Sequence, residues 1–216
     1  MMHIELDSFA HLYVEETIKL LKTPEMKKCL KDKNIELAYE TLYKMAEEDF
    51  GVVPVFTAIL YNSGINPLPH MKSTYPLMFR GLDIPEIVIP ENIDTIAEYT
   101  FASRHITKLS LPKSLKEVIA KGFCSCLSLK EIIFEPDNEN NLVIGKQAAA
   151  RCIALTTLEL PKNVSSIGEN AFSSCKNLTT VKYAGTVEEW NYIAKNWQCL
   201  PDGVKIQCSD GEDIYM

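Results

Sequence analysis

The sequence has no long hydrophobic run and no recognisable secretion signal. Its most apolar stretch, residues 51–61, is too short to span a bilayer and is interrupted by Pro54. Residues Met1 to Asp7 lack the basic start and the apolar run of a signal peptide. We therefore expect a cytoplasmic protein that does not contact a membrane.

An excess of basic residues is also absent. The 216 residues include 22 Lys and Arg against 29 Asp and Glu, which gives a net charge of -7. Binding to a nucleic acid backbone requires a basic surface that displaces counterions. We therefore expect no direct contact with DNA or RNA.

Motifs for catalysis, metal binding or cofactor binding are missing as well. The four histidines, His3, His11, His70 and His105, are scattered, and none stands at metal-ligand spacing from another histidine or a cysteine. The glycines are isolated and form no phosphate-binding loop. We therefore expect no enzyme activity, no metal and no cofactor. Two alternatives stay open: a Cys-His pair that meets only in space, and a catalytic cleft in the helical half.

The first part of the chain has the apolar periodicity of helices. Helices are expected at 9–21, 24–30, 35–45 and 50–61. Asp7 or Ser8 can cap the first helix, Thr23 the second and Asn34 the third. Residues 65–82 break the pattern with prolines and large apolar side chains, which predicts an ordered connector. We expect residues 1–82 to pack as an N-terminal cap on the segment that follows.

The rest of the chain repeats itself about every 23 residues. Each unit begins with an apolar-x-apolar strand that a proline ends, because proline cannot donate to a β-ladder. These strands are expected at 87–89, 109–111, 132–134 and 158–160. Such a period predicts a solenoid, in which each turn buries its apolar face against its neighbours. The fold class is therefore α+β: a helical domain at 1–82, then a solenoid domain of four repeats and a capping unit at 83–216.

Like residues of successive repeats should form columns in the solenoid core. Phe101, Phe123 and Phe172 define an aromatic column, and Ala149 occupies the same place in the third repeat. About three additional residues, within 137–141, follow the third strand and should bulge outward, because the flanking columns keep register. Ala149 should leave a space that its neighbours fill, or a soft spot in the core.

The seven cysteines are odd in number, which favours a reduced protein over a disulfide framework. Cys126, Cys152 and Cys175 occupy one column of successive repeats. A vertical ladder of thiols does not supply the four converging ligands of a tetrahedral metal site. We interpret the three residues as small buried core side chains. Trp190 and Trp197 are expected to cover the last turn.

The outward-facing strand positions form the candidate binding surface. Side chains alternate along a strand, so the residues between the buried ones make a ladder on one face of the sheet. The ten candidates are Glu86, Val88, Lys108, Ser110, Glu131, Ile133, Thr157, Glu159, Thr180 and Lys182. Repeat proteins bind partners through such extended faces. The alternative interpretation is a solvated sheet face without a partner.

Residues 161–178, PKNVSSIGENAFSSCKNL, resemble the repeat of BspA-like leucine-rich repeat proteins. Residues 183–191 and 208–211 are similar to the closing unit of that family. The resemblance covers about 83–211, whereas the first 80 residues have no such match. Members of the family serve as adhesins, surface antigens and intracellular interaction modules, and the repeat carries no catalytic residue. The resemblance therefore implies a leucine-rich repeat solenoid with a parallel sheet that binds other proteins.

Together these patterns predict a non-enzymatic intracellular module whose partner is another protein. A concrete version is an inhibitor in a bacterial cell, such as a phage-encoded anti-defence protein of the anti-CRISPR type. The rival prediction is a bacterial cell-surface adhesin or antigen of the BspA-like type. The rival requires a signal peptide or an anchor, and this sequence shows neither.

Overall fold

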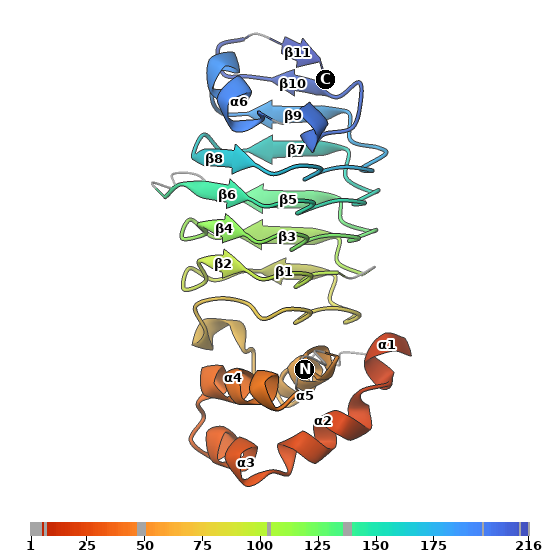
Figure 1. The fold of residues 1–216 in the computed structure, drawn as a ribbon, viewed down its shortest axis with the longest axis vertical. Coiled ribbons are helices and arrows are strands. Elements are labelled where there is room, and N and C mark those ends of the chain that lie inside the picture. The colour runs from red at the N-terminus through yellow and green to blue at the C-terminus, as the bar shows by residue number, and fades with distance from the viewer. Residues whose placement is uncertain are drawn as a thin grey trace.

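The structure, a computed structural model, describes residues 6, 8–46, 51–102, 105–135, 140–195, 197–211 and 213–215. Helices occupy one end of an elongated molecule, stacked turns of chain form its body, and a helix with short strands closes the other end (Figure 1). One continuous hydrophobic core runs from Met26 in the helices to Ile206 near the C-terminus.

In the described residues of the N-terminal part the helices are α1 (Ser8–His11), α2 (Val14–Leu21), α3 (Pro24–Lys31), α4 (Ile35–Met45) and α5 (Val52–Asn62). The first expected helix is divided into α1 and α2. Two predicted caps are confirmed, because the Thr23 side chain accepts a hydrogen bond from Met26 N and that of Asn34 accepts one from Leu37 N. The candidate cap Asp7 and the expected start at Phe50 lie outside the described residues.

The helices pack on the first turn of the solenoid, as the sequence predicted. Tyr39 of α4 is fully buried, and its ring stacks on Tyr75 with centroids 5.2 Å apart. The Tyr39 hydroxyl lies 2.7 Å from Thr57 Oγ1 of α5, and the Thr57 hydroxyl donates a hydrogen bond to Val53 O at 3.0 Å. Polar and aromatic contacts thus join α4, α5 and the solenoid in one core.

Two rows of short strands run along the solenoid. The first row contains β1 (Glu86–Val88), β3 (Lys108–Leu111), β5 (Glu131–Phe134), β7 (Thr157–Leu160), β9 (Thr180–Tyr183), β10 (Lys205–Gln207) and β11 (Asp213–Tyr215). The second row contains β2 (Thr95–Ile96), β4 (Glu117–Val118), β6 (Leu142–Ile144) and β8 (Val164–Ile167). Paired strands are parallel except for β10 and β11. The expected fold class is confirmed.

The solenoid begins earlier than the sequence indicated. After a short 3-10 helix, η1 (Leu68–His70), the segment predicted as a connector forms a turn of its own. Asp94 N donates to Lys72 O at 2.9 Å, and Phe79 N donates to Thr100 O at 2.8 Å. Phe79 extends the aromatic column by one member. Residues 72–82 are therefore a first turn without a regular strand.

Backbone hydrogen bonds confirm the place of Ala149 in the aromatic column. Phe123 N donates to Ala148 O, and Ala149 N donates to Ala171 O, each at 2.7 Å. Ala149 and both of its neighbours are buried. Of the predicted insertion, 137–139 lie outside the described residues, whereas Asn140 and Asn141 are exposed.

The C-terminal unit covers the last turn of the solenoid. Helix α6 (Val187–Ile193) begins with a capping box in which Thr186 and Glu189 bond each other's backbone N–H groups. Trp190 of this helix is buried and meets the Tyr183 ring with centroids 5.6 Å apart. A 3-10 helix, η2 (Trp197–Cys199), precedes β10. The expected covering role is confirmed for Trp190, whereas the Trp197 side chain lies outside the described part.

Candidate functional site

The ten predicted positions lie on the outer face of the first row. The β-ladders align Glu86 with Lys108 and Glu131, and Val88 with Ser110 and Ile133. Further along, Thr157 aligns with Thr180, and Glu159 with Lys182. Five of the ten are exposed, namely Glu86, Val88, Glu131, Glu159 and Lys182, and the other five are half-buried. The structure therefore brings these side chains onto one surface, and their role in binding stays a prediction.

Ion pairs cross this face between neighbouring turns. Lys108 Nζ lies 3.3 Å from Glu131 Oε2, and Lys182 Nζ lies 2.7 Å from Glu159 Oε1. Both pairs are exposed to solvent, so each contributes only about 0–1 kcal/mol to stability. Of the five charged side chains among the ten positions, the two pairs neutralise four, and Glu86 alone has no ionic partner among the described residues.

The first row is interrupted between β5 and β7. Strands β1, β3 and β5 form one sheet, whereas β7, β9, β10 and β11 form another. Among the described residues no backbone hydrogen bond joins β5 to β7. The second row continues past this point, with a register shift between Leu142 and Val143 where β6 meets β8.

The interruption falls at the irregular third repeat. The additional residues lie between β5 and β6, while β5 stays in register with β3 and β6 stays in register with β4. Strand β7 leads directly into β8, which pairs with β6. The turn that contains β7 and β8 is therefore joined to the preceding turn through the second row.

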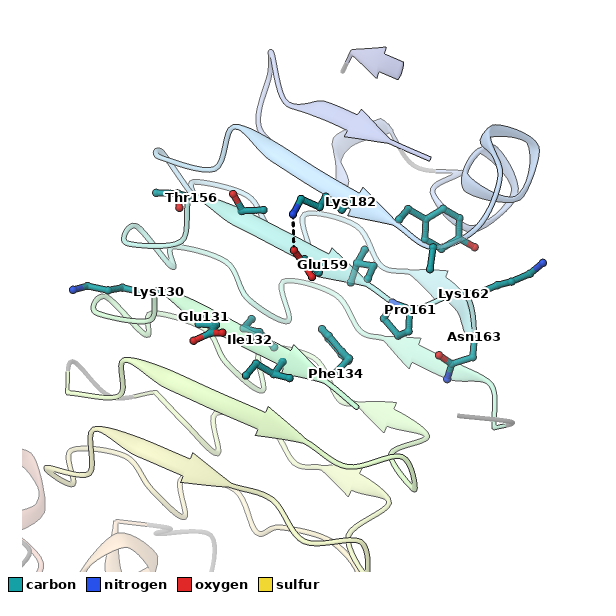
Figure 2. Close-up of a pocket in the computed structure, with 15 residues that line it drawn as sticks. Lys130, Glu131, Ile132, Phe134, Thr156, Glu159, Pro161, Lys162, Asn163 and Lys182 are labelled. Carbon is teal, nitrogen blue, oxygen red and sulfur yellow. Dashed lines mark hydrogen bonds and ion pairs between the residues drawn. The ribbon is translucent and has the colours of Figure 1, made fainter. Parts of the chain in front are cut away.

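A cleft of about 960 Å³ lies over the interruption. Its lining includes Glu131, Ile133 and Phe134 from β5, Thr157 and Glu159 from β7, and Lys182 from β9. Figure 2 shows Lys130 at one end of the cleft and Lys162 at the other. The volume is in the range of known ligand pockets. The cleft is a concave feature within the predicted binding face.

Sequence reasoning missed several residues that line this cleft. Phe134 stands where regular repeats place a buried leucine, yet it is half-exposed. Asn163 lines the far end, donates from Nδ2 to Asn140 O at 2.7 Å, and has a buried Oδ1 that lacks a described hydrogen-bond partner. The available signal was the third repeat itself, where glutamate separates Phe134 from the expected proline.

The three column cysteines each use their thiol in the core. Cys126 Sγ donates to Phe101 O, Cys152 Sγ to Phe123 O at 3.3 Å, and Cys175 Sγ to Ala149 O at 3.2 Å. Hydrogen bonds with the neighbouring thiols, together with burial, raise the pKa of Cys152 well above its ordinary value. A raised pKa keeps the Cys152 thiol protonated at neutral pH, which fits a packing role for this residue.

The described ranges contain no group of three or more His, Cys, Asp or Glu side chains arranged to hold a metal ion. His105 Nδ1 lies 3.4 Å from Asp83 Oδ1, so this histidine faces a carboxylate. Within the same ranges, every helix is too short or too polar to cross a membrane.

This architecture defines a leucine-rich repeat protein with a helical N-terminal part. Residues 72–196 match the description "BspA type Leucine rich repeat region" in six copies. Because the match spans more than half of the chain, the protein belongs to the BspA-type leucine-rich repeat family. The matched range also begins at the turn formed by residues 72–82, which the sequence reasoning had treated as a connector.

Several solved structures are similar to parts of the chain. A leucine-rich cell surface protein from Faecalibacterium prausnitzii is 19% identical with a TM-score of 0.46, covering 53% of this chain and 36% of that one. The T. pallidum leucine-rich repeat protein is 25% identical with a TM-score of 0.46, covering 51% of each chain. The pneumococcal vaccine antigen PcpA is 18% identical with a TM-score of 0.42, covering 63% and 39%.

The match thus spans about a third to a half of the length of these three structures. No curated protein matches the chain. The BspA-type repeat is a fold for protein-protein interaction or adhesion, and it typically serves as a non-enzymatic binding module.

Proposed function

We propose that this chain is a non-enzymatic module that binds another protein through the outer face of the first strand row. The observation that carries the proposal is the cleft between β5 and β7, which opens within the face already predicted from the sequence. Repeat solenoids offer extended surfaces of this kind, and a concave site on such a surface concentrates contact area.

The chemistry of the face supports protein recognition. Val88 is 71% exposed, and Ile133 is half-buried in the cleft, so apolar contact area is present on both sides of Ser110. Charged side chains surround these positions. Protein interfaces combine an apolar core with a polar rim in the same way.

Inhibition is the finer form of this proposal: the chain would occupy a functional surface of its partner. The cytoplasmic, phage-encoded version stays a prediction. The alternative is an adhesin or antigen that uses the same face on a cell surface. Fractionation of the producing cells separates the two, because an adhesin is recovered on the outer surface and an intracellular inhibitor in the cytosol.

Affinity capture tests the proposed face. The wild-type chain and an Ile133→Asp, Glu159→Lys double variant are immobilised and exposed to a lysate of the organism that encodes the chain. A matched control carries Val143→Asp with Glu117→Lys, because these exposed residues are aligned neighbours in the second strand row. Both double variants introduce the same kinds of side chain and the same change of net charge. Circular dichroism establishes that each variant is folded.

The expected result is a protein that the wild-type chain and the control retain and the double variant loses. Retention by all three proteins would place the interface elsewhere, with the helical domain as the next surface to test. If the wild-type chain retains no protein from the lysate or from surface extracts, the proposed function is overturned.

A further inference from the structure

We propose that the cleft between β5 and β7 binds an extended peptide segment of the partner that carries an acidic side chain at the Lys130 end. This inference rests on the proposed function and specifies the partner's chemistry. Four features of the cleft carry it: an unneutralised lysine, an apolar wall, unpaired strand edges and the spacing of the two strands.

The charged side chains that line the cleft determine whether it favours an acidic or a basic group of the partner. The cleft is lined by Lys130, Lys162 and Lys182 against two carboxylates, although the whole chain has a net charge of -7. Three of these charges are neutralised within the protein, since Lys182 pairs with Glu159 and Lys162 Nζ lies 3.2 Å from Glu189 Oε1. The other carboxylate, Glu131, pairs with Lys108 outside the cleft.

Lys130 is left as the cation that favours an added carboxylate. It is exposed, and no carboxylate of the described ranges lies within ion-pair distance of it. Nucleic acid phosphates would also satisfy a lysine, but the acidic surface of the chain opposes a polyanion. A single acidic side chain matches a single lysine without that repulsion.

The apolar wall and the length of the cleft favour a peptide. Ile133 and Phe134 are half-buried side chains that face the cleft beside the charged groups. From Lys130 to Phe134, β5 advances about 13 Å at about 3.3 Å per residue, so about four extended residues match that length. Side chains two residues apart lie on one face of such a segment, so an acidic side chain near Lys130 and an apolar side chain over Ile133 can both face the cleft.

The spacing of β5 and β7 shows how the peptide lies. Cα atoms of the two strands approach within 8 Å, whereas insertion of another strand needs two ladder spacings, about 9.6 Å. The peptide therefore lies over the strands, in contact with their outward side chains. No β-ladder joins β5 to β7 in the described residues, so the backbone groups on the facing edges of the two strands stay unpaired.

The backbone groups at this strand edge add hydrogen-bond contacts to a bound peptide. Glu131 N donates to Thr107 O and Glu135 N donates to Leu111 O, so the alternation of a parallel ladder directs the N–H and C=O groups of Ile132 and Phe134 toward β7. The edge offers donors and acceptors alike, so Lys130 alone sets the preferred sign of charge. A carboxylate that reaches down from the peptide can accept from the N–H groups in charge-assisted hydrogen bonds.

Two peptide pools test the assignment on the full chain. One pool contains fluorescein-labelled hexapeptides in which Asp or Glu stands two residues before Leu, Ile or Val with a serine between them, and the other replaces the acidic residues by Lys. Fluorescence anisotropy measures affinity, and amide chemical shifts of the labelled protein locate the site. Lys130→Glu is the test variant. Lys113→Glu is the matched control, because Lys113 is an exposed lysine of another turn with the same change of charge.

We expect the acidic pool to bind, to shift the amides of residues 130–134 and 156–160, and to lose about tenfold in affinity with Lys130→Glu. Lys113→Glu should retain the affinity within about twofold. Equal binding of the lysine pool, shifts confined to the second strand row, or no binding at about 1 mM peptide would overturn the inference. The double variant Ile133→Asp, Glu159→Lys could lose a captured partner that Lys130→Glu still binds with unchanged affinity. In that case the proposed function would stand and only this inference would fail.

Discussion

Phe79 stacks on Phe101, with ring centroids 5.2 Å apart and an interplanar angle of 11°. Both rings are fully buried. Phe101 continues the column to Phe123, with centroids 5.8 Å apart, while Tyr61 of α5 meets Phe79 at 6.2 Å. The aromatic column therefore continues through the first turn, which contains no regular strand, and joins the solenoid core to the helices.

Phe79→Ala should lower the free energy of unfolding by about 3–5 kcal/mol, because it removes a buried ring between α5 and the column. Urea denaturation followed by circular dichroism measures the change. Tyr192→Ala is the control, since this aromatic side chain is 67% exposed and its loss should cost about 0.5 kcal/mol or less. A loss below about 1 kcal/mol for Phe79→Ala would show that the first turn does not anchor the helices.

The repeat columns could be predicted because their signal is periodic. Leu109 and Ile132 stand at equivalent positions of successive repeats, and each belongs to a strand of alternating pattern. A proline follows the first strand directly and the second after one more residue. The structure pairs Leu109 with Ile132 in a parallel ladder. The register survives even at Ala149, where the side chain is atypical. Periodicity thus fixed the stacking without any knowledge of the contacts.

The first turn and the cleft lay beyond that reasoning for physical reasons. Residues 72–82 lack the apolar-x-apolar-proline strand, so only Phe79, 22 residues before Phe101, carries the repeat signal. The cleft lies where β8 stays paired with β6 in the second row while β7 has no ladder to β5 in the first row. The repeat pattern located the irregularity in the third unit but contained no information on which row of strands would separate.

Stability should decline in alkaline solution because buried acids keep their protons in the folded state. Burial raises the pKa of Cys199 to about 11 and that of Tyr75 to about 12, and it raises the pKa of Tyr39 further. In the unfolded chain, thiols and phenols ionise near about 8.5 and about 10. The unfolded state therefore binds fewer protons above about pH 8.5, so stability is full below that pH and falls above it.

Tyr39→Phe isolates one of these protons. Above about pH 10 the free energy of unfolding of the variant should fall less steeply than that of the wild-type chain, by up to about 1.4 kcal/mol per pH unit. At neutral pH it should cost about 1 kcal/mol, because Thr57 loses one hydrogen-bond donor but keeps its own bond to Val53 O. Urea titrations at several pH values measure both effects. Tyr192→Phe, the same change at an exposed site, should leave the alkaline slope unaltered.

Thiol labelling should follow burial along the cysteine column. Iodoacetamide at about pH 8 should modify the half-buried Cys124 in the native protein and spare Cys126, Cys152 and Cys175, because only an exposed thiolate reacts. Mass spectrometry of the digested protein identifies the labelled sites. In denaturant all of them should react. Native labelling of Cys152 as fast as that of Cys124 would contradict the packing role assigned to the column.

Hydrogen exchange should reveal the separation of β5 from β7 directly. The amides of Leu109 and Leu111 lie within the paired ladder of β3 and β5, whereas those of Ile132 and Phe134 face the cleft. An amide without a hydrogen-bond partner beside an open cleft exchanges without local unfolding. Ile132 and Phe134 should therefore exchange about tenfold or more faster than Leu109 and Leu111, as measured by NMR at neutral pH. Equal protection of the four amides would mean that β5 and β7 form a ladder in solution, and the cleft proposed to bind the acidic peptide would then be closed.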